Sequence, residues 1–117
     1  MLEEFNIPIF KKAYDLYKLC NSYRGGISKQ DRYGLWLRTE NTLLDIVEGI
    51  LKASHLSKRE KLPTLEMVNL KVNLLRVFVR LAKDTKTVDN EKYIAMQQLI
   101  DEIGRMLGGW IKSTKER

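Results

Sequence analysis

Apolar residues recur at spacings of three and four along almost the whole chain, and no segment alternates apolar and polar positions for long enough to form a strand. This pattern predicts four helices, over residues 8–23, 28–54, 64–83 and 90–112. The connections between them are short, and four helices joined in this way pack as an antiparallel up-down-up-down bundle. The sequence therefore predicts an all-α fold, with residues 1–117 forming one four-helix-bundle domain.

Residues with known preferences for helix starts agree with these four segments. Pro8 suits the first turn of a helix, where its missing N–H costs nothing. Ser28 and Asp31 have the spacing of a capping box, and Asp89 is a suitable N-cap for the last helix. The basic stretch SHLSKREKLP is expected to be a loop, with Pro63 opening the third helix.

Glycines occur at two informative places. The RGG stretch at residues 24–26 is expected to end the first helix in a left-handed conformation. Gly104, Gly108 and Gly109 instead interrupt the last apolar pattern, where each costs about 1 kcal/mol relative to alanine. Gly104 and Gly108 share a helix face, so we expect another backbone to approach closely there, either within the chain or between copies. Trp110 continues the apolar spacing, which favours a continuous helix over a helix that ends at Gly108.

Composition limits the classes of function. No run of about 18 uncharged apolar residues exists, so no membrane span is expected. The first ten residues lack the basic region and long apolar core of a secretory signal. A single cysteine, Cys20, cannot form an internal disulfide, which agrees with a reducing, cytoplasmic location.

Few residues are suited to catalysis. His55 is the only histidine and falls in a predicted loop, where a solvated side chain is the ordinary case. Cys20 lies on an apolar stripe and is expected to be a buried thiol. Asp45 and Glu48 are three residues apart on a helix, but a di-metal bundle needs two Glu-x-x-His motifs. We therefore expect no enzyme, no cofactor and no metal, with a small metal- or ligand-binding bundle built on Asp45 and Glu48 as an alternative.

Basic residues are concentrated in one part of the chain, whose net charge is +6. Residues 52–61 and 71–86 together hold nine of the 21 basic residues and two of the 15 acidic ones. Within the third helix, polar residues repeat at spacings of four and three and form one face: Asn69, Asn73, Arg76, Arg80 and Lys83. A solvated face usually mixes both signs of charge, so this asymmetry favours an anionic partner.

Arginine presents a planar fork of donors that matches phosphate or carboxylate. No aromatic residue interrupts the basic face, so contacts with a nucleic-acid backbone are favoured over stacking on bases. Such binding tolerates many sequences and weakens as salt is added. The candidate binding residues are Arg76, Arg80, Lys83, Lys71, Lys86, Lys58 and Arg59.

The third helix also has two adjacent apolar stripes, which implies burial on two sides. One stripe consists of Leu65, Val68, Val72, Leu75 and Val79, and the other of Leu70, Leu74, Val77 and Leu81. One small bundle does not need so much apolar surface on a single helix, so the pattern favours an oligomer.

Two stretches are similar to known bacterial proteins. The first, SKQDRYGLWLRTENTLLDIVEG at residues 28–49, resembles a helix signature of a four-helix-bundle superfamily that includes proteins encoded in intervening sequences of ribosomal RNA genes. Residues 33–35 match its aromatic-x-Leu element and residues 47–49 its Ala-Glu-Gly element, while Ser28 replaces its proline. The second, EIGRMLGGWIKS at residues 102–113, resembles the accessory variability determinant (Avd) family of diversity-generating retroelements, as do ENTLLDIVE and NLLRVFVRLAKD.

The Avd resemblance implies a non-catalytic protein that assembles as a homopentamer of four-helix protomers, forming a basic barrel with a central channel. It implies binding to the reverse transcriptase of the element and to template RNA or cDNA, in a complex that makes mutagenised cDNA to diversify a target gene. By this analogy Arg76, Arg80 and Lys83 contact polymerase or nucleic acid, and the oligomer or close-packing residues are Gly104, Arg105, Gly108 and Trp110. A generic member of the broader superfamily, with another structural or RNA-associated role, is the alternative.

Overall fold

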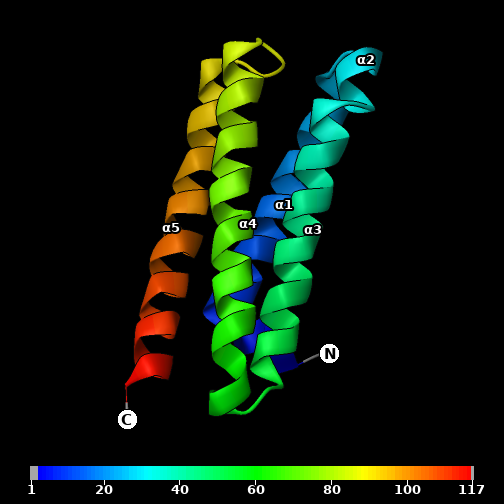
Figure 1. Cartoon of the computed structure of the whole chain (residues 1–117). Coiled ribbons are helices and arrows are strands. Elements are labelled where there is room, and N and C mark those ends of the chain that lie inside the picture. Colours follow the sequence, from blue (N-terminus) through cyan, green and yellow to red (C-terminus); the bar gives the residue numbers. More distant parts are fainter. Residues whose placement is uncertain (1–2, 117) are drawn as a thin grey trace.

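The computed structural model describes residues 3–116, which contain helices and no strand (Figure 1). Four long helices alternate in direction: α1 (Pro8–Tyr23), α3 (Leu35–Ser54), α4 (Lys58–Asp84) and α5 (Asn90–Lys115). Shorter helical segments are η1 (Glu3–Asn6), η2 (Arg24–Gly26) and α2 (Lys29–Arg32). The predicted all-α bundle is confirmed for this range, and residues 1, 2 and 117 of the predicted domain lie outside the described residues.

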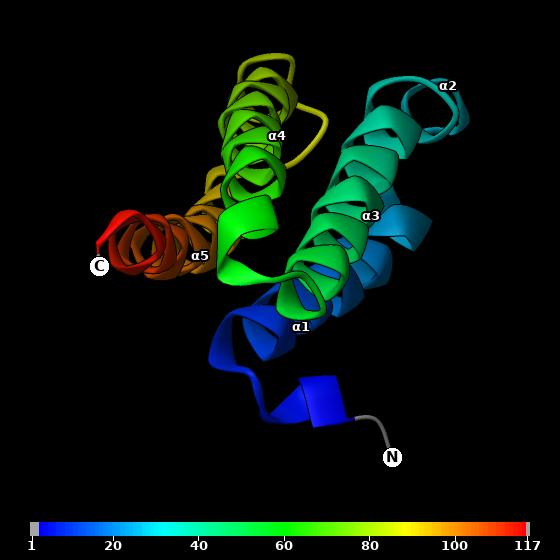
Figure 2. The ribbon, with the colours of Figure 1, turned by 60° about the horizontal axis from the view of Figure 1, so that its bottom comes forward.

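Each long helix packs on two neighbours. Helix α4 lies between α3 and α5, and α1 closes the arrangement by packing on both α3 and α5. Figure 2 shows the bundle from the end where α4 begins, with α5 beside α4 and α1 beside α3. The C-terminal end of α5 therefore lies at the same end of the bundle as the start of α4 (Figure 1).

The core lies between the four long helices and consists almost entirely of apolar side chains. Trp36 is its largest fully buried residue, and its indole N–H donates to the Cys20 carbonyl across 3.2 Å. Burial of one Leu or Ile side chain contributes about 1.5–3 kcal/mol, so this core is the main source of stability. Side chains three and four residues apart share a helix face, so each long helix contributes a periodic set of positions to this core.

The predicted helix over residues 28–54 is wrong as a single element. Helix α2 ends at Arg32, and the chain turns at Tyr33 and Gly34 before α3 begins (Figure 1). Gly34 has φ −106° and ψ −109°, and a Cβ there would lie 3.2 Å from the Gln30 carbonyl oxygen. Glycine permits this conformation, so it separates the two helices. Ser28 does cap a helix, since its Oγ accepts from the Asp31 N–H, but that helix is the short α2.

The predicted loop over residues 54–63 is confirmed only for residues 55–57, and its remaining residues are helical. Helix α4 already starts at Lys58, because the Ser57 side chain caps its N-terminus. The Ser57 hydroxyl accepts from the Glu60 N–H at 3.3 Å and donates to the Glu60 carboxylate at 2.8 Å. Pro63 lies inside α4 and has no N–H, so the Arg59 carbonyl loses its usual helical donor.

Of the remaining predictions about helix ends, one is wrong and two are confirmed. No glycine in the described residues has a positive φ, so the left-handed end predicted at residues 24–26 is wrong. The segment forms a 3₁₀ turn instead, closed by the Ile27 N–H on the Arg24 carbonyl at 3.1 Å. The Asp89 N-cap is confirmed, because its carboxylate accepts from the Lys92 N–H at 2.9 Å. Helix α5 passes all three of its glycines and continues to Lys115, which confirms the continuous helix.

No helix in the described range combines the length and the apolar character needed to cross a membrane.

Candidate functional site

The outer side of α4 is apolar along most of its length. Leu70, Met67 and Val77 are 59%, 55% and 54% exposed, Leu81 is also exposed, and Leu74 is half-buried. These five residues, here called the α4 apolar stripe, follow one another at spacings of three and four and share one face. Monomeric soluble proteins seldom expose a contiguous apolar patch of this kind, so the stripe is a candidate interaction surface.

The predicted burial of α4 on two sides is wrong for the protomer. The first predicted stripe lies in the core, as expected: Leu65, Val68, Val72, Leu75 and Val79. The second, which the structure extends by Met67, faces solvent in the protomer. Burial on the second side therefore needs another chain.

A second apolar face lies on α3. Leu37, Leu44 and Leu51 are seven residues apart and exposed, and we call them the α3 leucine face. Helix α3 turns Asp45 and Gly49 toward α4, and Leu44 lies about 100° around the helix from Asp45. The α3 leucine face and the α4 apolar stripe therefore point to different sides of the protomer.

Three of the predicted binding residues lie together where α4 borders α5. Arg76 forms an ion pair with Asp101 of α5, and the Lys83 ammonium lies 4.6 Å from the centre of the Tyr93 ring. Arg80 lies between them along α4 and is exposed. We call Arg76, Arg80 and Lys83 the basic edge.

Carboxylates within the chain partly offset the charge of the predicted residues. The Arg80 Nε donates to both oxygens of Asp84, at 3.1 and 3.2 Å. Lys71 pairs with Asp45 of α3 at 3.1 Å, so it lies on the opposite side of α4 from the basic edge. Lys86 is in the turn after α4 and has φ 62°. Exposed ion pairs contribute about 0–1 kcal/mol, so an external anion could displace these carboxylates at small cost.

Gly104 makes room for the Arg76 side chain. A Cβ on Gly104 would lie 2.6 Å from Nη2 of Arg76, so the guanidinium occupies the space next to this glycine. Hydrogen bonds from Arg76 first and Gln97 second lower the pKa of Asp101. The predicted close approach of a backbone within the chain is therefore wrong at Gly104, and within residues 3–116 no atom of another element lies within 4 Å of a Cβ on Gly108. Close approach at Gly108 between copies stays a prediction.

The remaining predicted oligomer residues differ in their surroundings. Arg105 is exposed on α5. Trp110 is half-buried against the core, and the Lys61 ammonium lies 5.4 Å from its ring centre. A hollow of about 310 Å³ adjoins Trp110 and is also lined by Ile7, Pro8, Ile9 and Met106.

Lys58 and Arg59 lie in the first turn of α4 and not in a loop. Together with Lys115 of α5 they line a hollow of about 610 Å³, to which Thr114 and Glu116 also contribute. In the part of the chain that the structure describes, none of these three cations has a carboxylate partner within 4.0 Å. Sequence reasoning missed Lys115, because its proximity to Lys58 depends on how α4 and α5 pair.

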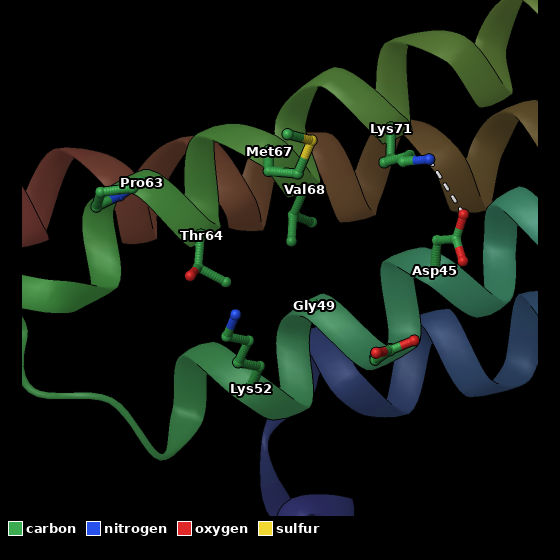
Figure 3. A pocket seen from close by; sticks show the side chains of 9 residues that line it. Asp45, Gly49, Lys52, Pro63, Thr64, Met67, Val68 and Lys71 are labelled. Carbon is green, nitrogen blue, oxygen red and sulfur yellow. Dashed lines mark hydrogen bonds and ion pairs between the residues drawn. The ribbon is translucent and has the colours of Figure 1, made fainter.

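A groove of about 520 Å³ separates the exposed sides of α3 and α4 (Figure 3). The Asp45–Lys71 ion pair crosses one end of it, and Lys52 projects from α3 toward α4 (Figure 3). Gly49 allows the two helices to approach here, since a Cβ would lie 2.4 Å from Cγ2 of Val68. Within residues 3–116 no three His, Cys, Asp or Glu side chains are placed to hold a metal ion.

Cys20 and His55 are two residues considered for catalysis from the sequence, and the contacts of both are structural. Cys20 is buried, as predicted, with its sulfur 3.7 Å from that of Met96. Burial first and the Glu40 charge second raise the pKa of the Cys20 thiol to about 12, so the thiolate is not available at neutral pH. His55 follows α3 and its exposed ring lies 2.7 Å from the Glu4 carboxylate.

An ion pair that the sequence did not reveal joins the ends of α1 and α3. Glu40 is only 4% exposed and pairs with Arg24, whose guanidinium lies 5.7 Å from the Tyr33 ring centre. A buried carboxylate without a partner is very costly, so Arg24 compensates the charge of Glu40. This pair fixes the corner from which α2 projects (Figure 1).

Comparison with known proteins identifies one matching family. The model of a family described as bAvd-like matches residues 9–114, which include the four long helices almost completely. No curated protein matches the chain.

Proposed function

Since this chain belongs to the bAvd-like family, an accessory and non-catalytic family, we propose that it is the accessory scaffold of a diversity-generating retroelement. In this proposal the protein acts in the cytoplasm as a ring-shaped homo-oligomer. The oligomer binds the reverse transcriptase of the element together with template RNA or cDNA and so supports mutagenic copying.

The observation that best supports this role is the α4 apolar stripe. Met67, Leu74 and Leu81 are seven residues apart, as are Leu70 and Val77, and the two series interleave. This is the a/d pattern by which helices pack against one another. A helix from another chain therefore fits the stripe, and each fully covered Leu side chain contributes about 1.5–3 kcal/mol.

The placement of the two apolar faces supports a ring. The α3 leucine face and the α4 apolar stripe lie on different sides of the protomer, so contact between the two joins copies head to tail. A head-to-tail interface generates a closed ring when its rotation closes. The number five comes from the Avd resemblance described above.

The first experiment measures the mass of the purified chain in solution by light scattering. The wild-type protein is expected to be an oligomer, and the Leu70→Glu/Val77→Glu variant is expected to dissociate while its circular dichroism stays helical. Ile94→Glu is the matched control, because Ile94 is also exposed but lies on α5, outside both faces. A monomeric wild-type protein would contradict the scaffold and favour a generic bundle protein of the broader superfamily.

The second experiment tests the partner. The chain and the reverse transcriptase encoded by the same element are expected to elute together from a sizing column. A genome with neither a reverse-transcriptase gene nor a template repeat near this gene would count against the retroelement role.

A further inference from the structure

At the end of the bundle where α4 begins and α5 ends, cations from both helices gather. Lys58 and Arg59 lie in the first turn of α4 and Lys115 in the last turn of α5, around the hollow of about 610 Å³. Lys112 lies one turn earlier on α5 and is exposed. We call these four residues the basic end.

The cations of the basic end and those of the basic edge differ in whether carboxylates of the same chain pair with them. Arg76 and Arg80 of the edge each have a carboxylate partner in the chain. Among the described residues, no carboxylate lies within 4.0 Å of Lys58, Arg59 or Lys115. Carboxylates of the chain therefore offset the positive charge of the basic end less than they offset that of the basic edge.

Two acidic residues lie close to the basic end and do not remove its charge. Glu60 accepts from the Ser57 hydroxyl at 2.8 Å as part of the α4 cap, and Glu116 lines the hollow. Among the described residues, these four cations and two carboxylates leave an excess of positive charge at this end of the bundle. The hollow has a volume of about 610 Å³, which lies in the range of small-ligand sites.

We propose that the basic end is the site where this protein binds the phosphodiester backbone of a nucleic-acid strand. This inference rests on the proposed function. Arg59 offers a planar fork of donors and the lysines act as point charges, a combination suited to phosphate oxygens. Among the described residues, the side chains that line the hollow include no aromatic ring on which a base could stack, so binding there is independent of sequence.

The test compares two variants with the same net charge. One replaces three cations of the basic end, as Lys58→Gln/Arg59→Gln/Lys115→Gln. The other replaces three cations that belong neither to the basic end nor to the candidate binding residues, as Lys18→Gln/Lys29→Gln/Lys92→Gln. Binding of a fluorescently labelled single-stranded RNA of arbitrary sequence is measured by anisotropy across a range of salt concentrations.

Each phosphate contact to a single strand contributes about 0.7 to the slope of log affinity against log salt concentration. Loss of three contacts is expected to lower the slope of the basic-end variant by about 2, and its affinity at least about tenfold. The control variant is expected to change the slope by less than about 0.7, the value of a single contact. If the control loses as much affinity as the basic-end variant, or wild-type protein binds no RNA, the proposal is wrong.

Oligomer mass and co-elution with the reverse transcriptase are measured on the same proteins. A wild-type chain that forms the oligomer and binds the polymerase but not RNA refutes the basic end alone. A chain that does neither refutes the proposed function itself. A basic-end variant that keeps RNA and loses the polymerase overturns the proposal, since the site then binds a protein surface. Arg59→Gln and Lys115→Gln, each made singly, test the same slope should the triple variant lose helicity.

Discussion

Substituting two helical glycines by alanine should change stability in opposite directions. Gly49 lies on α3 where α4 approaches, and an added Cβ would meet Cγ2 of Val68 at 2.4 Å. Val68 is 2% exposed and branched at Cβ, so it has little room to move. Gly109 lies on α5, and a Cβ added there would have no atom of a neighbouring element within 4 Å. The two positions therefore separate helix propensity from overpacking.

The expected magnitudes follow from these contacts. In a helix, replacing glycine with alanine gains about 1 kcal/mol from propensity at either position. At Gly49, overpacking of the core costs about 1–3 kcal/mol, so Gly49→Ala should lower the free energy of unfolding by about 1 kcal/mol. Gly109→Ala should raise it by up to about 1 kcal/mol. The difference between the two variants, about 1–3 kcal/mol, measures the overpacking cost.

The assay is unfolding in urea followed by far-ultraviolet circular dichroism, with all proteins at one concentration because assembly affects apparent stability. A double-mutant cycle with Val68→Ala identifies the contact. In that background Gly49→Ala should no longer destabilise, since the methyl group that it meets is gone. If Gly49→Ala stabilises the protein as much as Gly109→Ala does, α3 and α4 do not approach as closely as described.

Three further perturbations test other parts of the structure. Arg24→Ala should lower the free energy of unfolding by about 3 kcal/mol in urea titrations, because Glu40 is left buried without its partner, and adding Glu40→Gln should restore part of the loss. The pKa of Cys20 is raised from 9.0 to about 12, so the unfolded chain loses this proton first and stability should fall as the pH rises from about 9 toward 12. Cys20→Ala should remove that part of the pH dependence, and an unchanged profile would contradict the burial of the thiol. Pro63→Ala restores an N–H donor for the Arg59 carbonyl and should raise the free energy of unfolding by up to about 3 kcal/mol. Thermal or urea unfolding would detect this change. A loss of stability would indicate that the proline ring is needed in the groove.

The helices of the bundle were predictable because each buries a face at helical spacing, and their ends were predictable where one side chain forms a cap. Asp89 is such a case. The start of α4 was not predicted, because a proline such as Pro63 suits a first helical turn, whereas the cap that begins the helix is Ser57, whose hydroxyl accepts from the Glu60 N–H. The break at Gly34 was missed because the apolar pattern continues through it.

The candidate site was predictable only as a set of residues on one helix. The spacing placed Arg76, Arg80 and Lys83 together, and the structure agrees. The sequence did not reveal that Asp101 and Asp84 partner two of them, nor that Lys115 joins Lys58, since these depend on how helices pair and on which way side chains turn. A one-dimensional charge count does not include such contacts.

The most direct test of the central claim is reconstitution of the copying complex from purified components. The chain, the reverse transcriptase of its element and the template RNA are combined, and cDNA synthesis is measured with the wild-type chain, with Leu70→Glu/Val77→Glu and with no chain. The accessory-scaffold account predicts that the wild-type chain elutes with the polymerase and that cDNA forms only with it, while the stripe variant fails in both. A polymerase that elutes alone and makes the same amount of cDNA without the chain would contradict the account.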